Sequence, residues 1–235
     1  MLNTVLFDLD GTLLPLNQAE FTKAYVTRLS MRLVSFGYDP NAVAEALWLG
    51  VGAMVKGAGE TTNEETFWRV FENALGAGIR EKTALFEDFY KGEFQEIAAI
   101  TSPSPLVPSL ISDLKKKGLR LVLATNPFFP KIATDSRIRW AGLSPDDFCH
   151  VTYYENSHFC KPNPLYYKEI ASTLSLSPET CLMVGNDVEE DMMARELGFD
   201  VFLLTDCILN PKGKDISAYP SGDFHALTAY IEAKL

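Results

Sequence analysis

The sequence predicts an α/β fold: one parallel sheet covered by helices, with a helical block inserted after the first strand. Beyond about residue 105, short apolar runs alternate with amphipathic helical patterns, which is the rhythm of strand–helix units in a parallel sheet. Between residues 17 and 99, helical spacings follow one another without a convincing strand pattern. Together these two observations favour one α/β domain that carries a helical insertion.

The first elements along the chain set the predicted domain boundaries. Thr4–Phe7 is expected to be a strand, and a Ser/Pro-rich linker follows the helical block at residues 101–105. Asparagines, glycines and apolar spacing predict four helices in the block, at residues 17–37, 40–50, 63–76 and 80–100. We therefore expect a core domain formed by residues 1–16 and 100–235, and a cap domain formed by residues 17–99.

The remaining elements belong to the predicted core. The run at residues 119–125 is nearly continuously apolar, as in a strand buried on both faces of a sheet. Helices are expected to start after Asn126-Pro127 and after Asn163-Pro164, because Asn caps helices and Pro suits the first turn. The other predicted elements are a helix at 107–117, a weaker strand at 150–154, a strand at 181–185, a helix at 187–198, a strand at 199–205 and a final helix at 224–235.

Composition narrows the functional class. The 235 residues suffice to bury a core, and the net charge of −10 without a basic run argues against nucleic-acid or anionic-membrane partners. The four cysteines form no CxxC pair, so we expect reduced thiols rather than zinc or disulfides. Asp8 and Asp10 interrupt the apolar start, which argues against a signal peptide, and no apolar run approaches the ~18 residues of a membrane span. A cytoplasmic protein is expected.

One motif needs a chemical explanation. The first predicted strand ends in Asp8 and Asp10, and two carboxylates ~5 Å apart at an effective dielectric of ~20 repel by roughly 3 kcal/mol. Three other polar groups follow later elements: Thr125-Asn126, Lys161-Pro162, and the run from Gly185 to Asp191. In a parallel sheet these groups meet at the carboxyl edge, where ligands bind.

This convergence predicts a metal and phosphate site. Asp8 and Asp187, with Asp191 as a candidate third carboxylate, are expected to form an oxygen-rich pocket suited to Mg²⁺, which would neutralise the repulsion. The Thr125 hydroxyl and backbone amides at a helix start can hold phosphate oxygens, and Lys161 adds a compact positive charge.

On these residues the chain resembles the haloacid dehalogenase-like (HAD) hydrolase superfamily. Its four motifs occur in order: Asp8-Leu9-Asp10-Gly11-Thr12, Thr125-Asn126, Lys161-Pro162 and Gly185-Asn186-Asp187-Val188-Glu189-Glu190-Asp191. The resemblance implies a Rossmann-like parallel-sheet core, and the helical block has the place of the family's C1-type cap. The order of the motifs and the place of the helical block are typical of a C1-capped, phosphatase-type member of the superfamily.

The resemblance also implies roles for these residues. Asp8 would be the nucleophile that forms an aspartyl-phosphate, and Asp10 would protonate the leaving oxygen and later activate water. Phosphate would be bound by Thr125, Asn126 and Lys161. Mg²⁺ would be held by the side chain of Asp8, the carbonyl of Asp10 and Asp187.

The metal motif departs from the commonest family pattern, which has Asp directly after the glycine. Here Asn186 follows Gly185, and Asp187 comes next. Asn186 could ligate the metal through its amide oxygen. Alternatively, Asp191 could compensate for the missing negative charge without contacting the metal, and the sequence leaves both possibilities open.

Several activities fit this set of motifs. A Mg²⁺-dependent phosphatase acting on a small phosphorylated metabolite is favoured, with a phosphomutase of the same fold as the nearest alternative. Dehalogenases of the family lack an acid at the position of Asp10, so the presence of Asp10 argues against that activity. A phosphonoacetaldehyde hydrolase would need an activated lysine in the cap; Lys56 and Lys23 are present, but nothing in the sequence marks either as activated. A non-catalytic, regulatory binding module is disfavoured because every acid of the motifs is present.

The cap sequence is less informative. Lys56, Glu60, Thr61 and Thr62 are expected in a loop between helices, where Gly57 and Gly59 could permit closure over the cleft. The aromatic residues Phe67, Trp68 and Phe71 have helical spacing and are expected in the cap core rather than in a ligand box.

Overall fold

The computed structural model describes all residues from 1 to 235 and shows one six-stranded sheet. Its strand order is β3-β2-β1-β4-β5-β6, and every neighbouring pair is parallel. The strands are β1 (Thr4–Phe7), β2 (Arg120–Leu123), β3 (His150–Val151), β4 (Cys181–Gly185), β5 (Asp200–Leu204) and β6 (Ser221–Gly222). The predicted α/β fold with a parallel sheet is therefore confirmed.

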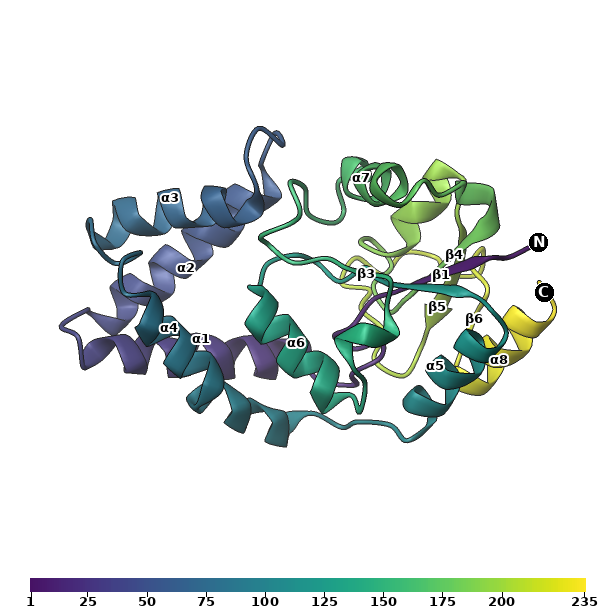
Figure 1. Ribbon diagram of the computed structural model, residues 1–235, viewed down its shortest axis with the longest axis horizontal. Helices are drawn as coiled ribbons and strands as arrows, with labels where there is room; N and C mark the ends of the chain where they lie inside the picture. The colour runs from purple at the N-terminus through teal and green to yellow at the C-terminus, as the bar shows by residue number, and fades with distance from the viewer.

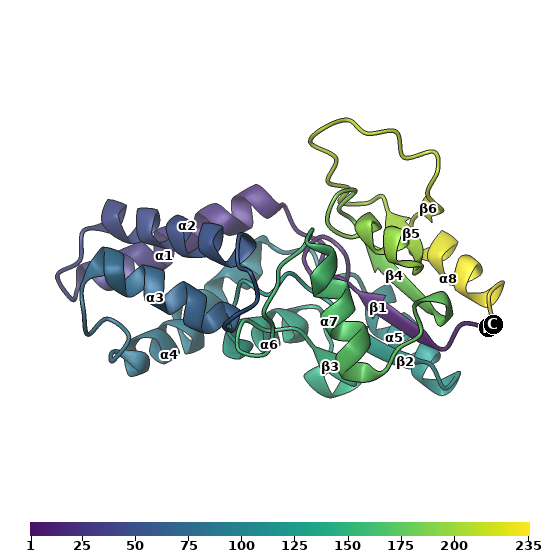
Figure 2. The ribbon, with the colours of Figure 1, turned by 90° about the horizontal axis from the view of Figure 1, so that it is seen from above.

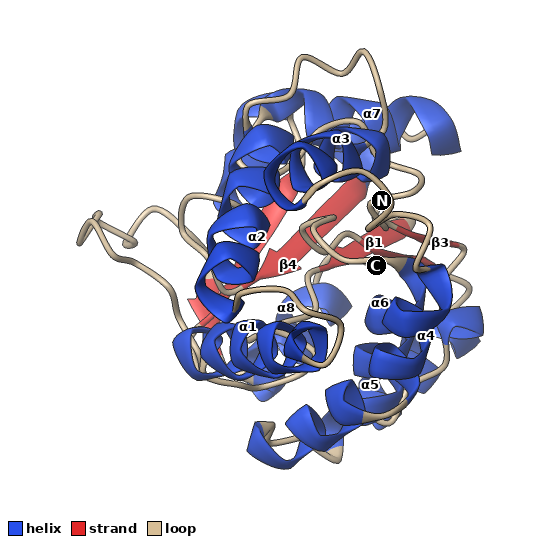
Figure 3. Cartoon of the chain, turned by 90° about the vertical axis from the view of Figure 1, so that its left-hand side faces the viewer, coloured by secondary structure: helices blue, strands red, loops and turns tan.

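Helices cover both faces of this sheet (Figures 1 and 3). One face carries α5 (Leu106–Lys116), α6 (Lys131–Trp140) and α8 (Phe224–Glu232), and the other carries α7 (Pro164–Leu174) and the 3₁₀ helix η4 (Met192–Leu197). Side chains alternate between the two cores, so Val5 and Phe7 pack on the first face and Leu6 on the second. Two further 3₁₀ turns are η2 (Pro145–Asp147) and η3 (Pro178–Thr180).

The helical block lies beyond the carboxyl edge of the sheet (Figures 1 and 2). It comprises α1 (Gln18–Val34), α2 (Pro40–Val55), α3 (Asn63–Leu75), α4 (Thr83–Lys91) and the 3₁₀ helix η1 (Glu93–Ile100). The chain leaves and re-enters the core at adjacent points, because Leu16 and Thr101 form an antiparallel bridge. The side chains of Asn17, Asp39 and Thr62 cap α1, α2 and α3 respectively.

Several sequence-based predictions differ from the structure. The helix predicted at 40–50 continues to Val55, and the one predicted at 224–235 ends at Glu232. The predicted helix at 80–100 is broken at Gly92, and the strand at 150–154 is only two residues long. The helix expected directly after Asn126 begins at Lys131, since the Asn126 side chain bonds to other parts of the chain instead of capping it. The helix expected at 187–198 starts only at Met192, and β6 was not predicted.

The delay before Met192 has a local cause. One carboxylate oxygen of Asp187 accepts hydrogen bonds from the backbone N–H groups of Glu189 and Glu190, at 2.7 and 2.9 Å. This arrangement folds the segment into turns before the 3₁₀ helix begins. None of the helices combines the length and the hydropathy that a membrane-spanning helix requires.

Candidate active site

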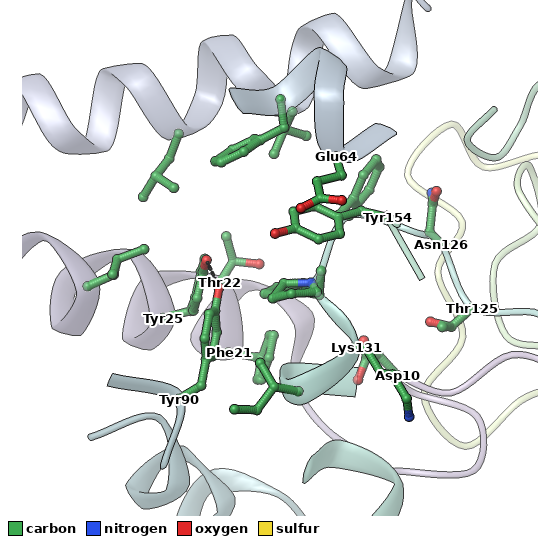
Figure 4. A pocket seen from close by; sticks show the side chains of 18 of the residues that line it. Asp10, Phe21, Thr22, Tyr25, Glu64, Tyr90, Thr125, Asn126, Lys131 and Tyr154 are labelled. Atoms are coloured by element: carbon green, nitrogen blue, oxygen red, sulfur yellow. Dashed lines mark hydrogen bonds between the residues drawn. The ribbon is translucent and has the colours of Figure 1, made fainter. Parts of the chain in front are cut away.

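A cavity of about 850 Å³ lies between the carboxyl edge of the sheet and the helical block. The ends of β1, β2 and β4 supply its polar lining, and α1, α3 and α4 supply aromatic side chains. Figure 4 shows Asp10, Thr125 and Asn126 on one side of this cavity and Tyr25, Tyr90 and Tyr154 around the rest. The structure thus brings together the predicted residues Asp8, Asp10, Thr125, Asn126, Asn186, Asp187 and Asp191.

Lys161 lies behind the nucleophile candidate rather than in the cavity lining. Its side chain is fully buried, and its Nζ donates to Asp8 Oδ1 at 3.0 Å and to Asp191 Oδ1 at 2.6 Å. Burial opposes the charged form of this lysine, but Asp191 and Asp8 outweigh that effect and hold its pKa well above the usual range. One oxygen of Asp8 is therefore held by a cation, and Oδ2 takes no hydrogen bond.

Asp191 is fixed on both of its carboxylate oxygens. Oδ1 accepts from Lys161, and Oδ2 accepts from the backbone N–H of Asp187 at 2.9 Å. Gly185 makes this position possible, since a Cβ on that residue would lie 2.1 Å from Asp191 Oδ2. Burial raises the pKa of Asp191 above its usual range, although the charge of Lys161 opposes the shift. Asp191 thus fixes the position of the Lys161 ammonium group next to Asp8.

Asp10 has a partner that the sequence did not reveal. Arg137 on α6 is almost completely buried and donates from Nη1 to Asp10 Oδ2. Its guanidinium carbon lies 4.3 Å from the ring centroid of Phe129, and its Nη2 donates to Thr134 Oγ1 at 3.1 Å. The second oxygen of Asp10, Oδ1, is buried without a hydrogen-bond partner. Burial raises the pKa of Asp10 to about 6, although Arg137 opposes the shift.

Thr125 and Asn126 follow β2 and behave differently. The Thr125 carbonyl is held by the hydroxyls of Tyr166 and Thr152 at 2.9 and 2.6 Å, while its own hydroxyl has no partner and the residue lines the cavity. The side chain of Asn126 is engaged, because it donates to Glu190 Oε2 at 2.8 Å and accepts from the Lys161 backbone N–H at 3.2 Å. Asn126 therefore positions the segment that carries Lys161, and only Thr125 presents a free side-chain group.

Asn186 and Asp187 also differ in what they present. The Asn186 amide bridges two loops, since its oxygen accepts from Thr12 Oγ1 at 3.0 Å and its nitrogen donates to the Cys207 carbonyl at 2.6 Å. Asp187 uses only Oδ1 for the turn described above, which leaves Oδ2 without a hydrogen bond.

The donor chemistry of these residues fits Mg²⁺. Asp8 Oδ2, Asp187 Oδ2 and the carbonyl of Asp10 are hard oxygen donors, and none takes part in a hydrogen bond. No three His, Cys, Asp or Glu side chains are grouped closely enough to form a metal cage by themselves. Mg²⁺ commonly binds through one or two carboxylates and keeps several waters, so this sparse set suits it.

Charge balance supports the same fit. The carboxylates of Asp8, Asp10, Asp187 and Asp191 face only two buried cations, Lys161 and Arg137. Burial raises the pKa of Glu190 to about 8 and also raises the pKa values of Asp10 and Asp191, so these three groups carry less than their full charge at neutral pH. An excess of negative charge is left for a divalent cation to neutralise.

With the fold and this geometry established, comparison with known proteins identifies the class. A family model of haloacid dehalogenase-like hydrolases matches residues 2–198. The chain belongs to that family, and the expectation of a HAD-like hydrolase is confirmed.

Individual relatives add detail. The chain is 27% identical over 202 residues to a phosphoglycolate phosphatase of Vibrio vulnificus, covering 86% of this chain and 82% of the relative. Its structure resembles that of a HAD phosphatase from Thermococcus onnurineus, with a TM-score of 0.59, 18% identity and 98% of each chain covered. It also resembles the magnesium-bound HAD-hydrolase YfnB of Bacillus subtilis, with a TM-score of 0.58, 20% identity, and 98% and 99% of the two chains covered.

Proposed function

We propose that this protein is a Mg²⁺-dependent phosphatase that hydrolyses a small-molecule phosphomonoester through an aspartyl-phosphate on Asp8. The observation that carries the proposal is how the two oxygens of the Asp8 carboxylate differ. Lys161 Nζ donates a hydrogen bond to Oδ1 at 3.0 Å, whereas Oδ2 takes part in no hydrogen bond and is free to attack phosphorus. Membership of the hydrolase family and the 27% identity to a phosphoglycolate phosphatase support it. Residues 17–99 would act as the cap that encloses the substrate.

The first step is transfer of the phosphoryl group to the enzyme. Asp8 Oδ2 attacks phosphorus, the bond from phosphorus to the alcohol oxygen breaks, and Asp10 gives its proton to that oxygen. Asp10 suits this task because burial raises its pKa to about 6, and because its Oδ1 has no partner within the protein. Arg137 holds the other oxygen and so orients the carboxyl group.

The second step regenerates the enzyme. Water attacks phosphorus in the acyl-phosphate, the bond to Asp8 breaks, and the Asp10 carboxylate takes the proton of the water. The Thr125 hydroxyl, free of protein partners, would bind the phosphoryl oxygens in both steps. Lys161 would remain on Asp8 and stabilise the carboxylate that returns, since Asp191 holds the lysine in place at 2.6 Å.

A bound Mg²⁺ would be held by Asp8, the Asp10 carbonyl and Asp187, and would neutralise the charge that gathers between nucleophile and phosphate. We do not include Asn186 or Asp191 among the proposed ligands, because the hydrogen bonds of Asn186 tie two loops and those of Asp191 hold Lys161 and Asp187. A cytoplasmic location belongs to the same proposal and is supported by four free cysteines.

Release of inorganic phosphate from a panel of phosphorylated metabolites tests this function. We expect turnover that EDTA abolishes, that Asp8→Asn eliminates, and that Asp10→Asn lowers by roughly 10²–10⁴-fold. The exposed Asp146 provides a matched control, and Asp146→Asn should leave turnover unchanged. Isomerised products without phosphate release would replace the phosphatase by a mutase, and unaltered turnover in Asp8→Asn would refute the proposed nucleophile.

A further inference from the structure

The part of the cavity away from Asp8 is built from aromatic rings. Its residues come from helices of the cap and from the loops of the core that follow β2 and β3 (Figure 4). They include Phe21, Tyr25, Phe67, Trp68, Tyr90 and Tyr154. Phe67, Trp68 and Phe71 were expected only in the cap core; they pack there, and they also line this cavity.

The polar ends of these rings are bound to one another. The hydroxyls of Tyr25 and Tyr90 lie 3.0 Å apart, and Trp68 Nε1 donates to the Tyr154 hydroxyl at 3.3 Å. Tyr25 also packs edge-on against Phe129, with 4.9 Å between the ring centroids. With their polar atoms engaged, the rings present mainly carbon to the cavity, which suits the edges and faces of another aromatic ring.

The charged group that reaches into this space is negative. Glu64, half-buried on the first turn of α3, extends into the cavity beside Tyr154 (Figure 4). Its carboxylate takes part in no hydrogen bond or ion pair, whereas the nearby Glu155 caps α6 through the Lys131 backbone N–H at 2.9 Å. Both acids line the cavity, and burial, with a smaller contribution from the charge of Glu64, raises the pKa of Glu155.

No buried cation balances Glu64. The cations that border the cavity are Arg80, Lys131 and Arg139, and all three residues are solvent-exposed. Lys131 is also engaged, since its Nζ lies 2.6 Å from Asp135 Oδ2. A substrate carboxylate in this part of the cavity would lose water beside a negative charge, without a buried partner to compensate it.

We infer that the substrate is a phosphomonoester whose alcohol carries an aromatic ring and, on that ring, a cationic or N–H-donating nitrogen that meets Glu64. This inference rests on the proposed phosphatase activity and specifies its substrate class. The cavity volume of about 850 Å³ supports it, because a cavity of that size lies within the range of roughly 300–1,000 Å³ that holds drug-sized ligands. A two-carbon phosphorylated acid such as phosphoglycolate would leave most of that space empty and its aromatic lining without a partner.

A series of primary alkyl phosphates separates the ring and the charge from the chemistry. The compounds are ethyl phosphate, 2-phenylethyl phosphate and its para-aminomethyl and para-carboxyl derivatives, with 2-phosphoglycolate for comparison. The first four share closely similar leaving groups, so differences in kcat/KM report mainly the binding of the alcohol. We expect the phenyl group to raise kcat/KM over ethyl phosphate by about 30-fold or more, from burial of its apolar surface. The aminomethyl compound should be best and the carboxyl compound worse than its phenyl parent.

Glu64→Gln tests the charge, and Glu65→Gln is its matched control on the same helical turn, exposed and outside the cavity lining. Glu64→Gln should raise KM for the aminomethyl compound by about 10-fold or more while changing that for 2-phenylethyl phosphate by less than about threefold. Equal effects of both substitutions, or of Glu64→Gln on both compounds, would overturn the role of Glu64.

Failure of this inference is distinguishable from failure of the proposed function. Preference for ethyl phosphate or 2-phosphoglycolate, with Mg²⁺-dependent turnover intact, would overturn the substrate class and leave the phosphatase standing. If neither these compounds nor the metabolite panel releases phosphate, the proposed function fails. If the panel is hydrolysed and these compounds are not, calorimetric binding of the same compounds to the wild-type protein with Mg²⁺ compares their affinities directly. Tighter binding of the aminomethyl compound would support the inference, and equal or absent binding would overturn it.

Discussion

Replacing Gly185 with alanine tests the support beneath the active site. A Cβ at this position would lie 2.1 Å from Asp191 Oδ2, 2.2 Å from its Cγ and 2.5 Å from its Cβ. Rotation of the Asp191 side chain cannot relieve the contact at its own Cβ, and both carboxylate oxygens are held, by Lys161 at 2.6 Å and by the Asp187 N–H at 2.9 Å. The carboxylate must therefore move and weaken these bonds.

The magnitude follows from two contributions. Forcing an extra methyl group into a packed interior costs about 1–3 kcal/mol, and weakening hydrogen bonds to a charged group costs about 1.5–3 kcal/mol. We therefore expect Gly185→Ala to lower the free energy of unfolding by about 3–5 kcal/mol, or to lower Tm by about 10 °C for a chain of this length. Turnover should fall by about 10²-fold, because Lys161 loses the partner that aligns it with Asp8.

Thermal unfolding and phosphate release of the purified variant measure both effects. Gly52 on α2 provides the control, because a Cβ there would meet nothing within 4 Å. Gly52→Ala should stabilise the protein by up to about 1 kcal/mol, since alanine favours helix over glycine. If Gly185→Ala keeps both its Tm and its turnover, the arrangement of Asp191 beneath Lys161 is wrong.

Three other changes probe the surrounding groups. Thr125→Val removes a hydroxyl without protein partners, so it should lower kcat/KM by about 10-fold or more while Tm changes little; a large loss of Tm would count against a phosphate-binding role. Arg137→Met leaves the Asp10 carboxylate without its buried partner and should destabilise the fold by about 3–5 kcal/mol, as urea unfolding would show; a stable variant would contradict that pairing. Glu190 has a folded pKa of about 8 against an ordinary value of 4.5, so it contributes stability below pH ~4.5 that is lost as pH rises towards 8. The Mg²⁺-free protein should therefore unfold more readily at pH 8 than at pH 5, a trend to which the raised pKa values of Asp10 and Asp191 also contribute. Glu190→Gln should reduce this difference; an unchanged difference would show that Glu190 does not contribute to it.

The polar site could be predicted where it depends on local pattern and on sheet topology. The carboxyl ends of parallel strands share one edge, so the placement of Asp8 after β1 and of Asp187 after β4 implied their convergence. The strands themselves are short, strongly apolar runs, and β4 was predicted with its observed bounds.

Side-chain partners distant in sequence could not be predicted. Arg137 lies 127 residues from Asp10, and α6 mixes polar and charged residues on its buried side, so its pattern resembles a surface helix. A charged residue sharing a helix face with Ala133 and Thr134 was the only available signal. The engagement of Asn126 with Glu190 depends equally on tertiary structure, and it also explains why α6 begins later than expected.

The central claim is that Asp8 carries the phosphoryl group during turnover, and acid quenching of the enzyme with a turned-over phosphomonoester and Mg²⁺ tests it most directly. Mass spectrometry of the digested protein should find the mass of one phosphoryl group on the peptide that contains Asp8, and borohydride should convert that residue to homoserine. Asp10→Asn should preserve this modification when the substrate has a good leaving group, while Asp8→Asn should abolish it. Substrate turnover without a modified Asp8, or with the phosphoryl group on another residue, would contradict the account.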